Sequence, residues 1–307
     1  MTVPPSPPVT VVVPTHNRPE PMRRAVQSVL DQTYPGDIEV LVVFDACEPV
    51  LPDVVVPARR TVRALVNSRT RGPSGGRNSG AVAATGTYVA FLDDDDWWLP
   101  TKLQEQVPLL ERHPEAPLAA TAMVVDDGQR THVRRAPSES VTHAELVGDR
   151  LACLHTSSFL ARRSSLTGDL GLFDEEIPAS YGEDYDLLLR ASAVAPIPVL
   201  NEPLVGVAWQ GQSYFLGRWL DYAESWLFML DKHPDFRTDP KDLARIEAYV
   251  GFAYAAGGRR RDGARWAFRS LRKDWRGARA WLALAMAARL LGVRRIVALA
   301  RRVGKGV

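Results

Sequence analysis

The chain has 307 residues, of which 46% are hydrophobic and 24% charged, and its formal net charge is +2. That length is sufficient for two domains, or for one large domain with an appendage, and for a sizeable buried core. The composition excludes collagen, a wholly disordered chain and a disulfide-stapled mini-protein. The two cysteines, Cys47 and Cys153, lie far apart and outside any CxxC or Cys/His cluster. They therefore disfavour a structural zinc site and favour a reducing compartment.

The beginning of the chain, MTVPPSPPVT, lacks the basic region and apolar run of a secretory signal. We expect residues 1–8 to form a short disordered lead-in. No stretch of about eighteen apolar residues is free of charge, so we expect no ordinary transmembrane span. With the cysteines, these features predict a cytoplasmic protein.

The first hundred residues alternate between strand and helix patterns. Apolar, β-branched runs predict buried strands, and apolar residues at helical spacing predict helices between them. The expected strands are 9–13, 38–44, 62–66 and 88–92, and the expected helices are 20–32 and 76–84. This alternation predicts a parallel, doubly wound α/β sheet.

Polar residues follow three of these four strands. They are the run Thr15 to Arg18, then Asp45, and then the four consecutive aspartates 93–96. Ligands of such sheets bind beyond the carboxyl ends of the strands, so we expect a binding site there.

The rest of the chain changes character. Residues 115–210 mix strand-like runs at 118–125, 157–161 and 203–209 with a helix signal that begins near Glu183. From about Ser213 helical periods dominate, and segments 243–256 and 261–272 could pair as a helical hairpin. Residues 257–307 hold fifteen Lys and Arg against two Asp, a net charge of +13, which leaves −11 for the remainder. Such an acidic body with a basic tail predicts an anionic partner for the tail.

The aspartate run is the strongest chemical signal. Four adjacent carboxylates repel one another unless a cation neutralises them, and Mg²⁺ or Mn²⁺ is the usual one beside phosphate oxygens. A solvated acidic turn before a helix at Leu99 is the alternative. Trp97 and Trp98 could stack on a sugar ring, although core packing explains at least one of them equally well.

Two further segments have weaker signals. The glycine-rich run 71–80 would let the backbone approach an anion at a helix N-terminus, with Arg77 as a bidentate partner for a diphosphate, but a flexible turn explains it as well. Glu183 and Asp184 open a helix, where acids are ordinary capping residues. One of the two could instead take a proton from a hydroxyl.

Taken in order, these segments resemble the family 2 inverting glycosyltransferases with the GT-A fold. The resemblance rests on VTVVVPTHNR, VVFDA, GGRNSGAVAATGTYVAFLDDDDWWLPTKL, SSFLARRSSLTGDLGLFDE and YGEDYDLLLRA, and it covers about residues 9–210. It implies an α/β GT-A domain with a mixed sheet over 9–212, with a donor half at about 9–115 and an acceptor half at about 116–212. Residues 213–307 would then form an all-helical, basic C-terminal extension.

The resemblance also implies roles for individual residues. The nucleotide-sugar site would include the first turn and the following positions: Pro14, Thr15, Asn17, Arg18, Asp45, Arg77, Asp93 and Asp94. Asp93 and Asp95 correspond to the two carboxylates of the Asp-x-Asp motif that holds Mg²⁺ or Mn²⁺. Asp184 corresponds to the general base, with its neighbour Glu183 as the rival for that role. His155 lies where acceptor-side residues occur, although a structural hydrogen bond is the simpler explanation.

The function that this resemblance implies is a metal-dependent transfer of a sugar from a nucleoside diphosphate, UDP or dTDP, to a hydroxyl of a glycan, lipid-linked or small-molecule acceptor. A single displacement would invert the anomeric carbon. The alternatives are a sugar-nucleotide nucleotidyltransferase and a catalytically silent scaffold that binds glycan or membrane. The absence of a glycine-rich, basic loop after the first strand argues against the nucleotidyltransferase.

The basic tail allows two expectations. Residues 279–302 interleave arginines with aromatic and aliphatic residues, as amphipathic helices on an anionic membrane surface do. Alternatively the tail packs as a helical bundle on the catalytic domain or on a second subunit in a homo-oligomer. Nucleic acid is not expected, because no reading motif accompanies the charge. The membrane alternative would place the protein peripherally on the inner face of the cell membrane.

Overall fold

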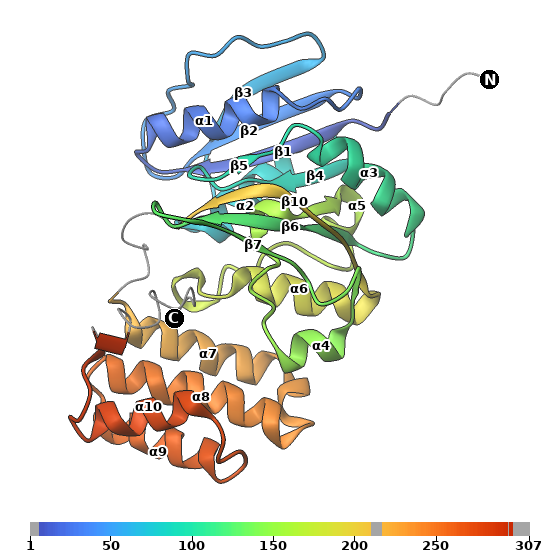
Figure 1. The fold of residues 1–307 in the computed structure, drawn as a ribbon. Helices are drawn as coiled ribbons and strands as arrows, with labels where there is room; N and C mark the ends of the chain where they lie inside the picture. The colour runs from blue at the N-terminus through green and yellow to red at the C-terminus, as the bar shows by residue number, and fades with distance from the viewer. Residues whose placement is uncertain (1–5, 210–216, 294, 297–307) are drawn as a thin grey trace. The chain divides into compact units, whose positions relative to one another are not determined.

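The computed structural model describes residues 6–209, 217–293 and 295–296, and its elements are drawn in Figure 1. The chain divides into two compact units. We name them the α/β unit, formed by Met1–Leu146, Arg150–Glu175 and Glu183–Gly211, and the helical unit, formed by Val147–Asp149, Glu176–Gly182 and Gln212–Val307. The predicted lead-in lies mostly outside the described residues, and Ser6 to Pro8 have no regular secondary structure.

The described strands of the α/β unit form a ten-stranded mixed sheet. Its main order is β3-β2-β1-β4-β9-β6-β10-β5, with β7 beside β6 and β8 beside β10. The strands are β1 (Val9–Thr15), β2 (Ile38–Phe44), β3 (Arg60–Val66), β4 (Tyr88–Phe91), β5 (Trp97–Trp98), β6 (Leu118–Asp126), β7 (Thr131–Arg134), β8 (Ser140–Val141), β9 (Leu160–Arg162) and β10 (Ile197–Ala208). The first four are parallel, and β9 joins β4 antiparallel. The carboxyl ends of β1, β2 and β4 therefore meet at one edge of the sheet.

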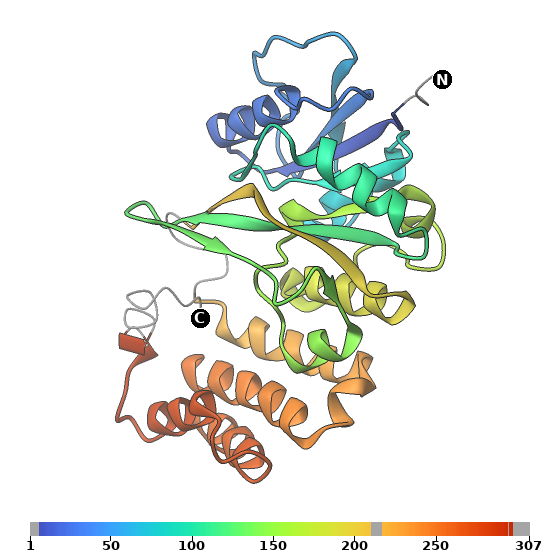
Figure 2. The ribbon, with the colours of Figure 1, turned by 45° about the vertical axis from the view of Figure 1, so that its right-hand side comes forward.

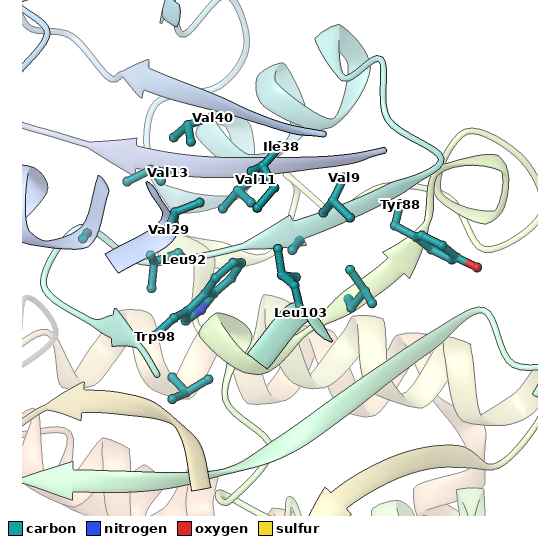
Figure 3. Close-up of a cluster of buried hydrophobic side chains, with 14 of the residues drawn as sticks. Val9, Val11, Val13, Val29, Ile38, Val40, Tyr88, Leu92, Trp98 and Leu103 are labelled. Atoms are coloured by element: carbon teal, nitrogen blue, oxygen red, sulfur yellow. The ribbon is translucent and has the colours of Figure 1, made fainter. Parts of the chain in front are cut away.

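One face of this sheet carries the main hydrophobic core. Helices α1 (Pro19–Leu30) and α3 (Lys102–Arg112) cover it with residues such as Val29 and Leu103. Because side chains alternate along a strand, this core takes Val9, Val11 and Val13 from β1. Figure 3 draws these side chains together with Trp98, which belongs to the same core. That tryptophan is 3% exposed, so core packing accounts for it.

Helix α2 (Pro73–Ala83) lies against the opposite face of β1 at very short range. A Cβ at Gly80 would stand 2.3 Å from Cγ1 of Val12, so only glycine permits this approach. The short distance brings the first turn of α2 to the strand ends.

The remaining elements of the middle region are short, apart from one helix. They are α4 (His143–Gly148), η1 (Thr156–Ser158), α5 (Arg163–Leu166), η2 (Pro178–Ser180) and α6 (Glu183–Val194). Nine residues of α6 are buried, including all three acids of its first turn.

The helical unit contains α7 (Trp219–Lys232), η3 (Pro234–Arg237), α8 (Pro240–Ala256), α9 (Arg260–Leu271) and α10 (Ala278–Ala287). Figures 1 and 2 show α8, α9 and α10 packed side by side, around a core that includes Phe252, Ala267 and Ala283. The pairing of α8 with α9 is the helical hairpin expected from the sequence. None of the described helices is long and apolar enough to cross a membrane.

The predicted mixed α/β sheet with a helical C-terminal region is confirmed. Three local predictions differ. Trp97 and Trp98 form a short strand that pairs with β10, so the next helix begins at Lys102 rather than at Leu99. The strand expected at 203–209 begins earlier, at Ile197, because it also pairs with β6 and β8. The expected strand at 157–161 begins as a 3₁₀ turn, and its extended part is Leu160–Arg162.

Candidate active site

The turn after β1 is held in place by its own side chains. His16 donates through Nδ1 to the carbonyl oxygen of Asp45 at 2.5 Å, and its Nε2 then accepts from the amide of Asn17 at 3.3 Å. Asn17 has a φ of 53°, in the left-handed region that asparagine tolerates better than most residues. The turn predicted to bind the nucleotide is thus tied to the end of β2.

The carboxylate of Asp45, the predicted partner of the base, organises the loop before α2. Its Oδ1 accepts from Nδ2 of Asn67 at 2.7 Å, and its Oδ2 accepts from the backbone N–H of Gly72 at 2.8 Å. The glycine-rich segment is therefore an ordered approach to α2, tethered to a strand end, and not a flexible turn.

Each of the four consecutive aspartates has a different environment. Asp94 is buried, accepts from Oγ1 of Thr15 at 2.7 Å and pairs with Arg18 at 3.1 Å. Burial raises its pKa to about 6, against the opposing effects of Thr15 and Arg18. Asp95 is more exposed and lies 2.8 Å from Arg18. Arg18 therefore already neutralises part of the charge that the sequence assigned to a metal.

Asp96 points into the protein. Its Oδ2 accepts from Oγ of Ser157 at 2.5 Å, and its Oδ1 accepts from the backbone N–H of Ala208 at 3.1 Å. Burial, together with the charges of Asp93 and Asp95, raises its pKa well above the usual value. Asp96 thus connects the aspartate turn to the segments that lead into β9 and out of β10.

Arg77 links a carboxylate of the aspartate run to a carboxylate at the start of α6. From the buried first turns of α2, its Nη2 lies 2.6 Å from Oδ1 of Asp93 and its Nη1 lies 2.6 Å from Oε1 of Glu183. Only 4% of the Arg77 side chain is exposed. A diphosphate would have to compete with these two carboxylates for the guanidinium.

The charges in this network explain the pKa values. Burial would raise the pKa of Asp93, but Arg77 holds it below the usual value. For Glu183, burial raises the pKa to about 7, helped by the adjacent negative Asp184 and opposed by Arg77. Glu183 therefore sits against a structural cation, which disfavours it as a mobile base.

Asp184 has a partner of its own. Nη2 of Arg150 contacts both carboxylate oxygens, at 2.9 and 2.7 Å, and the backbone N–H of Tyr185 donates to Oδ1 at 2.8 Å. Burial would raise the pKa of Asp184, but Arg150 and the nearby His155 hold it below the usual value. The group is thus ionised and oriented, as a base must be before it accepts a proton.

One set of side chains could hold a cation. Single ligand atoms of Asp93, Asp96 and His155 lie within 4.8 Å of one another. Burial lowers the pKa of His155, so its imidazole is neutral and able to act as a ligand. Two carboxylates and an imidazole fit a divalent metal. Asp93 belongs both to this set and to the predicted Asp93–Asp95 pair, whereas Asp95 contacts Arg18.

His155 also has a structural bond. Its Nδ1 accepts from the backbone N–H of Ser157 at 3.3 Å and caps the short helix η1. This is the structural hydrogen bond that the sequence favoured for it.

The structure reveals site residues that the sequence did not indicate. Arg150 holds Asp184, Ser157 holds Asp96, and Glu175 accepts from Nδ2 of Asn78 at 2.7 Å and pairs with Arg69 beside the glycine-rich loop. Each is far in sequence from its partner and has no motif of its own. Arg150, which follows Asp149 in the chain, gives no signal of its own until the fold supplies the distant carboxylate.

The predicted residues thus form two connected groups. Thr15, Arg18, Asp94 and Asp95 form one, and Asp93, Arg77 and Glu183 form the other, with Asp184 next in the chain. Asp45 organises the loop between Asn67 and Gly72. No contact of Pro14 with these charged groups is recorded among the described residues, although a Cβ at Gly76 would lie 3.1 Å from its ring.

A mixed sheet with carboxylates at the ends of its central strands is the arrangement of the GT-A fold, and solved structures support this fold. S. aureus TarS residues 1–349 superimpose with a TM-score of 0.57 at 15% identity, over 97% of this chain and 92% of that one. The mannosyltransferase PcManGT from Pyrobaculum calidifontis, solved with GDP-Man and Mn²⁺, gives 0.56 at 19% identity, over 97% and 80%. At these identities the likeness shows the fold.

Sequence comparison gives the family. The description "Glycosyl transferase family 2" matches residues 10–167, which is just over half of the chain. The chain therefore belongs to glycosyl transferase family 2.

Curated relatives differ in how much they share. The amylovoran biosynthesis glycosyltransferase AmsB of Erwinia amylovora is 26% identical over 262 residues, 80% of this chain and 82% of that one. The Escherichia coli UDP-Glc:alpha-D-GlcNAc-diphosphoundecaprenol beta-1,3-glucosyltransferase WfaP is 30% identical over 104 residues, 34% of this chain. The matched part spans about two fifths of the length of WfaP and of its E. coli counterpart WfgD.

Proposed function

We propose that the protein is an inverting glycosyltransferase that moves a sugar from a nucleoside diphosphate to an acceptor hydroxyl. The observation that carries this proposal is the ion-pair chain from Asp93 through Arg77 to Glu183, next to an ionised Asp184. This chain of ion pairs connects the strand end, where a donor would bind, with the start of the helix that carries the proposed base. Family membership and the GT-A fold support the same activity.

For the donor, we propose a UDP- or dTDP-sugar. The proposed contacts are the turn Pro14, Thr15, Asn17 and Arg18, the carboxylate of Asp45, and Asp93 and Asp94. Support comes from S. aureus TarS, a structural neighbour solved with UDP-GlcNAc, and from WfaP, which is named for UDP-Glc. PcManGT was solved with GDP-Man, so GDP belongs in the test.

For the cofactor, we propose Mg²⁺ or Mn²⁺, held by Asp93 together with Asp95 or with Asp96 and His155. A divalent ion would supply charge neutralisation for the departing diphosphate. Arg18 and Arg77 would contribute positive charge from the protein itself, since both already lie against the aspartate turn.

For the base, we propose Asp184. Arg150 and the N–H of Tyr185 fix its carboxylate, which would accept the proton of the acceptor hydroxyl as its oxygen attacks the anomeric carbon. Attack from the face opposite the leaving diphosphate inverts that carbon in one step. Glu183 is the weaker choice, because its carboxylate is already engaged by Arg77 at 2.6 Å and would have to leave that ion pair to accept a proton.

For the acceptor, we propose a hydroxyl on a glycan or lipid-linked saccharide in polysaccharide biosynthesis. AmsB and the succinoglycan biosynthesis protein ExoO of Rhizobium meliloti are named for such pathways, and WfaP for a diphosphoundecaprenol-linked sugar. A lipid-linked acceptor would place the enzyme peripherally at an anionic membrane surface. Small-molecule acceptors stay in the test, because a pre-mycofactocin glycosyltransferase of Mycobacterium tuberculosis is 31% identical over 249 residues, 74% of this chain and 48% of that one.

The test separates donor binding from transfer. Calorimetric titration of UDP, dTDP, GDP and ADP, with Mn²⁺ and with chelator, should identify one metal-dependent binder. Asp184→Asn keeps the shape of the side chain but removes its basicity, so transfer should fall by about 10² to 10⁴-fold while donor binding stays within a few-fold. Glu183→Gln is the matched control, because it removes the charge of the neighbouring carboxylate instead. Donor binding again shows whether the site is intact in this variant.

Three results would contradict the proposal. Equal loss of donor binding and transfer in Asp184→Asn would remove Asp184 as the base. Failure of every nucleotide to bind the wild-type protein would favour a catalytically silent scaffold. Formation of a sugar nucleotide from a sugar phosphate would indicate a nucleotidyltransferase, the alternative that the family assignment disfavours.

A further inference from the structure

One face of α9 carries three exposed arginines and an exposed aromatic ring. Arg261, Arg265, Phe268 and Arg272 follow one another at spacings of four, three and four residues, which places them on the same side of the helix. Phe268 is 59% exposed. A phenylalanine with most of its surface in water is costly to keep unless something covers it.

The turn after α9 adds two exposed tryptophans. Trp275 is 68% exposed and Trp281, in the first turns of α10, is 54% exposed. Nε1 of Trp281 donates to the carbonyl oxygen of Trp275 at 2.9 Å, so its polar atom is satisfied within the protein. That ring therefore presents mainly carbon to its surroundings.

The acids of this region do not cancel the charge of the arginines on that face. Asp262 pairs with Arg259 at 2.8 Å, and Oδ1 of Asp274 accepts from the backbone N–H of Arg276 at 3.0 Å. The buried Glu247 is neutralised by Arg269 and Lys273. The basic side chains in these ion pairs are neutralised within the helical unit, whereas Arg261, Arg265 and Arg272 are exposed.

We propose that this basic-aromatic face, formed by Arg261, Arg265, Phe268, Arg272, Trp275 and Trp281, docks on a bilayer that contains anionic lipids. Arginines pair with headgroup phosphates, and tryptophan rings favour the boundary between headgroups and acyl chains. Charge and exposed rings together fit this boundary, whereas charge alone would fit any polyanion.

Apart from Trp281, this face lies earlier in the chain than the segment 279–302 that the sequence suggested. Within α10, Ala280, Ala283 and Met286 are buried in the core of the helical unit, so that side of the helix packs on protein. Residues 294 and 297–302 of the segment lie outside the described residues. One side of α10 is thus used for packing within the helical unit, and the proposed docking rests mainly on the outward face of α9.

The experiment is flotation of the full-length protein with extruded vesicles of phosphatidylcholine alone and of phosphatidylcholine with 30 mol% phosphatidylglycerol. Wild type should bind only the anionic vesicles and should be released by high salt. The double variant Arg265→Glu and Arg272→Glu should lower the partition coefficient by on the order of 20-fold or more, since each surface arginine contributes about a fivefold factor. Trp275→Ala tests the aromatic part separately.

The matched control reverses two exposed arginines of the α/β unit, Arg112→Glu and Arg130→Glu, which changes the net charge by the same amount. Its partition should stay within twofold of wild type. Equal loss in test and control, or no flotation of wild type with anionic vesicles, would overturn the proposal, as would a Trp275→Ala variant that converts a dimer to a monomer without affecting vesicle binding. Metal-dependent donor binding, measured in parallel, should be unchanged in all variants, so a failure of docking is distinguishable from a failure of the proposed activity.

Discussion

The residue that most changes the chemistry of the site is Arg150, which no motif indicates. It meets both oxygens of Asp184 with one nitrogen and thereby sets the orientation of the proposed base as well as its charge. An ionised carboxylate that is already bound must still accept a proton in the transition state. Arg150 therefore keeps the carboxylate of Asp184 ionised, but it also lowers the affinity of that carboxylate for a proton.

Replacing Arg150 should shift the pH dependence of transfer. A carboxyl whose pKa is depressed stays ionised down to low pH, so removing the arginine raises that pKa and protonates the base at higher pH. In Arg150→Gln the acidic limb of the kcat/KM profile should move up by roughly one to three units, and kcat should fall about tenfold or more. Arg150→Lys, which keeps a charge, should recover part of the shift. An acidic limb that stays in place would show that Arg150 does not act on the base.

At the scale of elements, the close approach of α2 to β1 positions the loop of Asp45 and the side chain of Arg77. The approach depends on Gly80, because any Cβ there would collide with Val12. A similar close approach occurs at Gly206, where a Cβ would stand 1.9 Å from the ring of Trp97 and would disturb the pairing of β5 with β10. Glycines thus permit the packing that surrounds the aspartate turn.

Gly80→Ala should destabilise the protein. Overpacking a well-packed contact costs about 1–3 kcal/mol, which outweighs the gain in helix propensity from alanine. The thermal unfolding midpoint should fall by several degrees. Gly292→Ala is the control, since a Cβ there meets no atom within 4 Å and its midpoint should stay nearly unchanged. A stabilised Gly80→Ala would mean that α2 can move away from the strand without cost.

Some helices and strands could be predicted from the sequence, and others could not. The continuous apolar runs and the punctuation by glycine and proline predicted the four parallel strands and their helices, because these signals are local. The strand of Trp97 and Trp98 was not predicted, because it exists only through pairing with β10, more than a hundred residues later. Likewise Asp93, Arg77 and Glu183 were each predicted, but the ion pairs that join them depend on the packing of α2 and α6.

At the scale of the whole molecule, the helical unit includes two short segments from the middle of the chain. Within that unit, Oγ of Ser225 donates to the carbonyl oxygen of Tyr181, whose ring lies 5.2 Å from that of Tyr222. Nη2 of Arg245 donates to the carbonyl oxygen of Val147 at 2.5 Å. Segment 147–149 leads directly into Arg150, and segment 176–182 leads directly into Glu183.

A chain that ends at residue 211 should therefore lose the support of segments 147–149 and 176–182 as well as the C-terminal helices. Without Ser225, Tyr222 and Arg245, the two segments before Arg150 and Glu183 have lost these partners. We expect transfer to fall at least tenfold, with metal-dependent donor binding affected less. Co-expression with residues 212–307 should restore activity if the helices reassemble on the segments. A fully active chain of 211 residues would show that the segments need no such support.

The division of the chain also bears on how such enzymes can be recombined. The backbone changes from one unit to the other five times along its length, so no single cut separates the two. A chimera joined at residue 211 would pair foreign helices with native segments 147–149 and 176–182. An exchange between relatives would succeed only if all three pieces came from the same parent. The C-terminal helices therefore cannot be exchanged as one independent piece. We expect new combinations of an α/β unit with a helical unit to arise by gradual substitution and not by gene fusion.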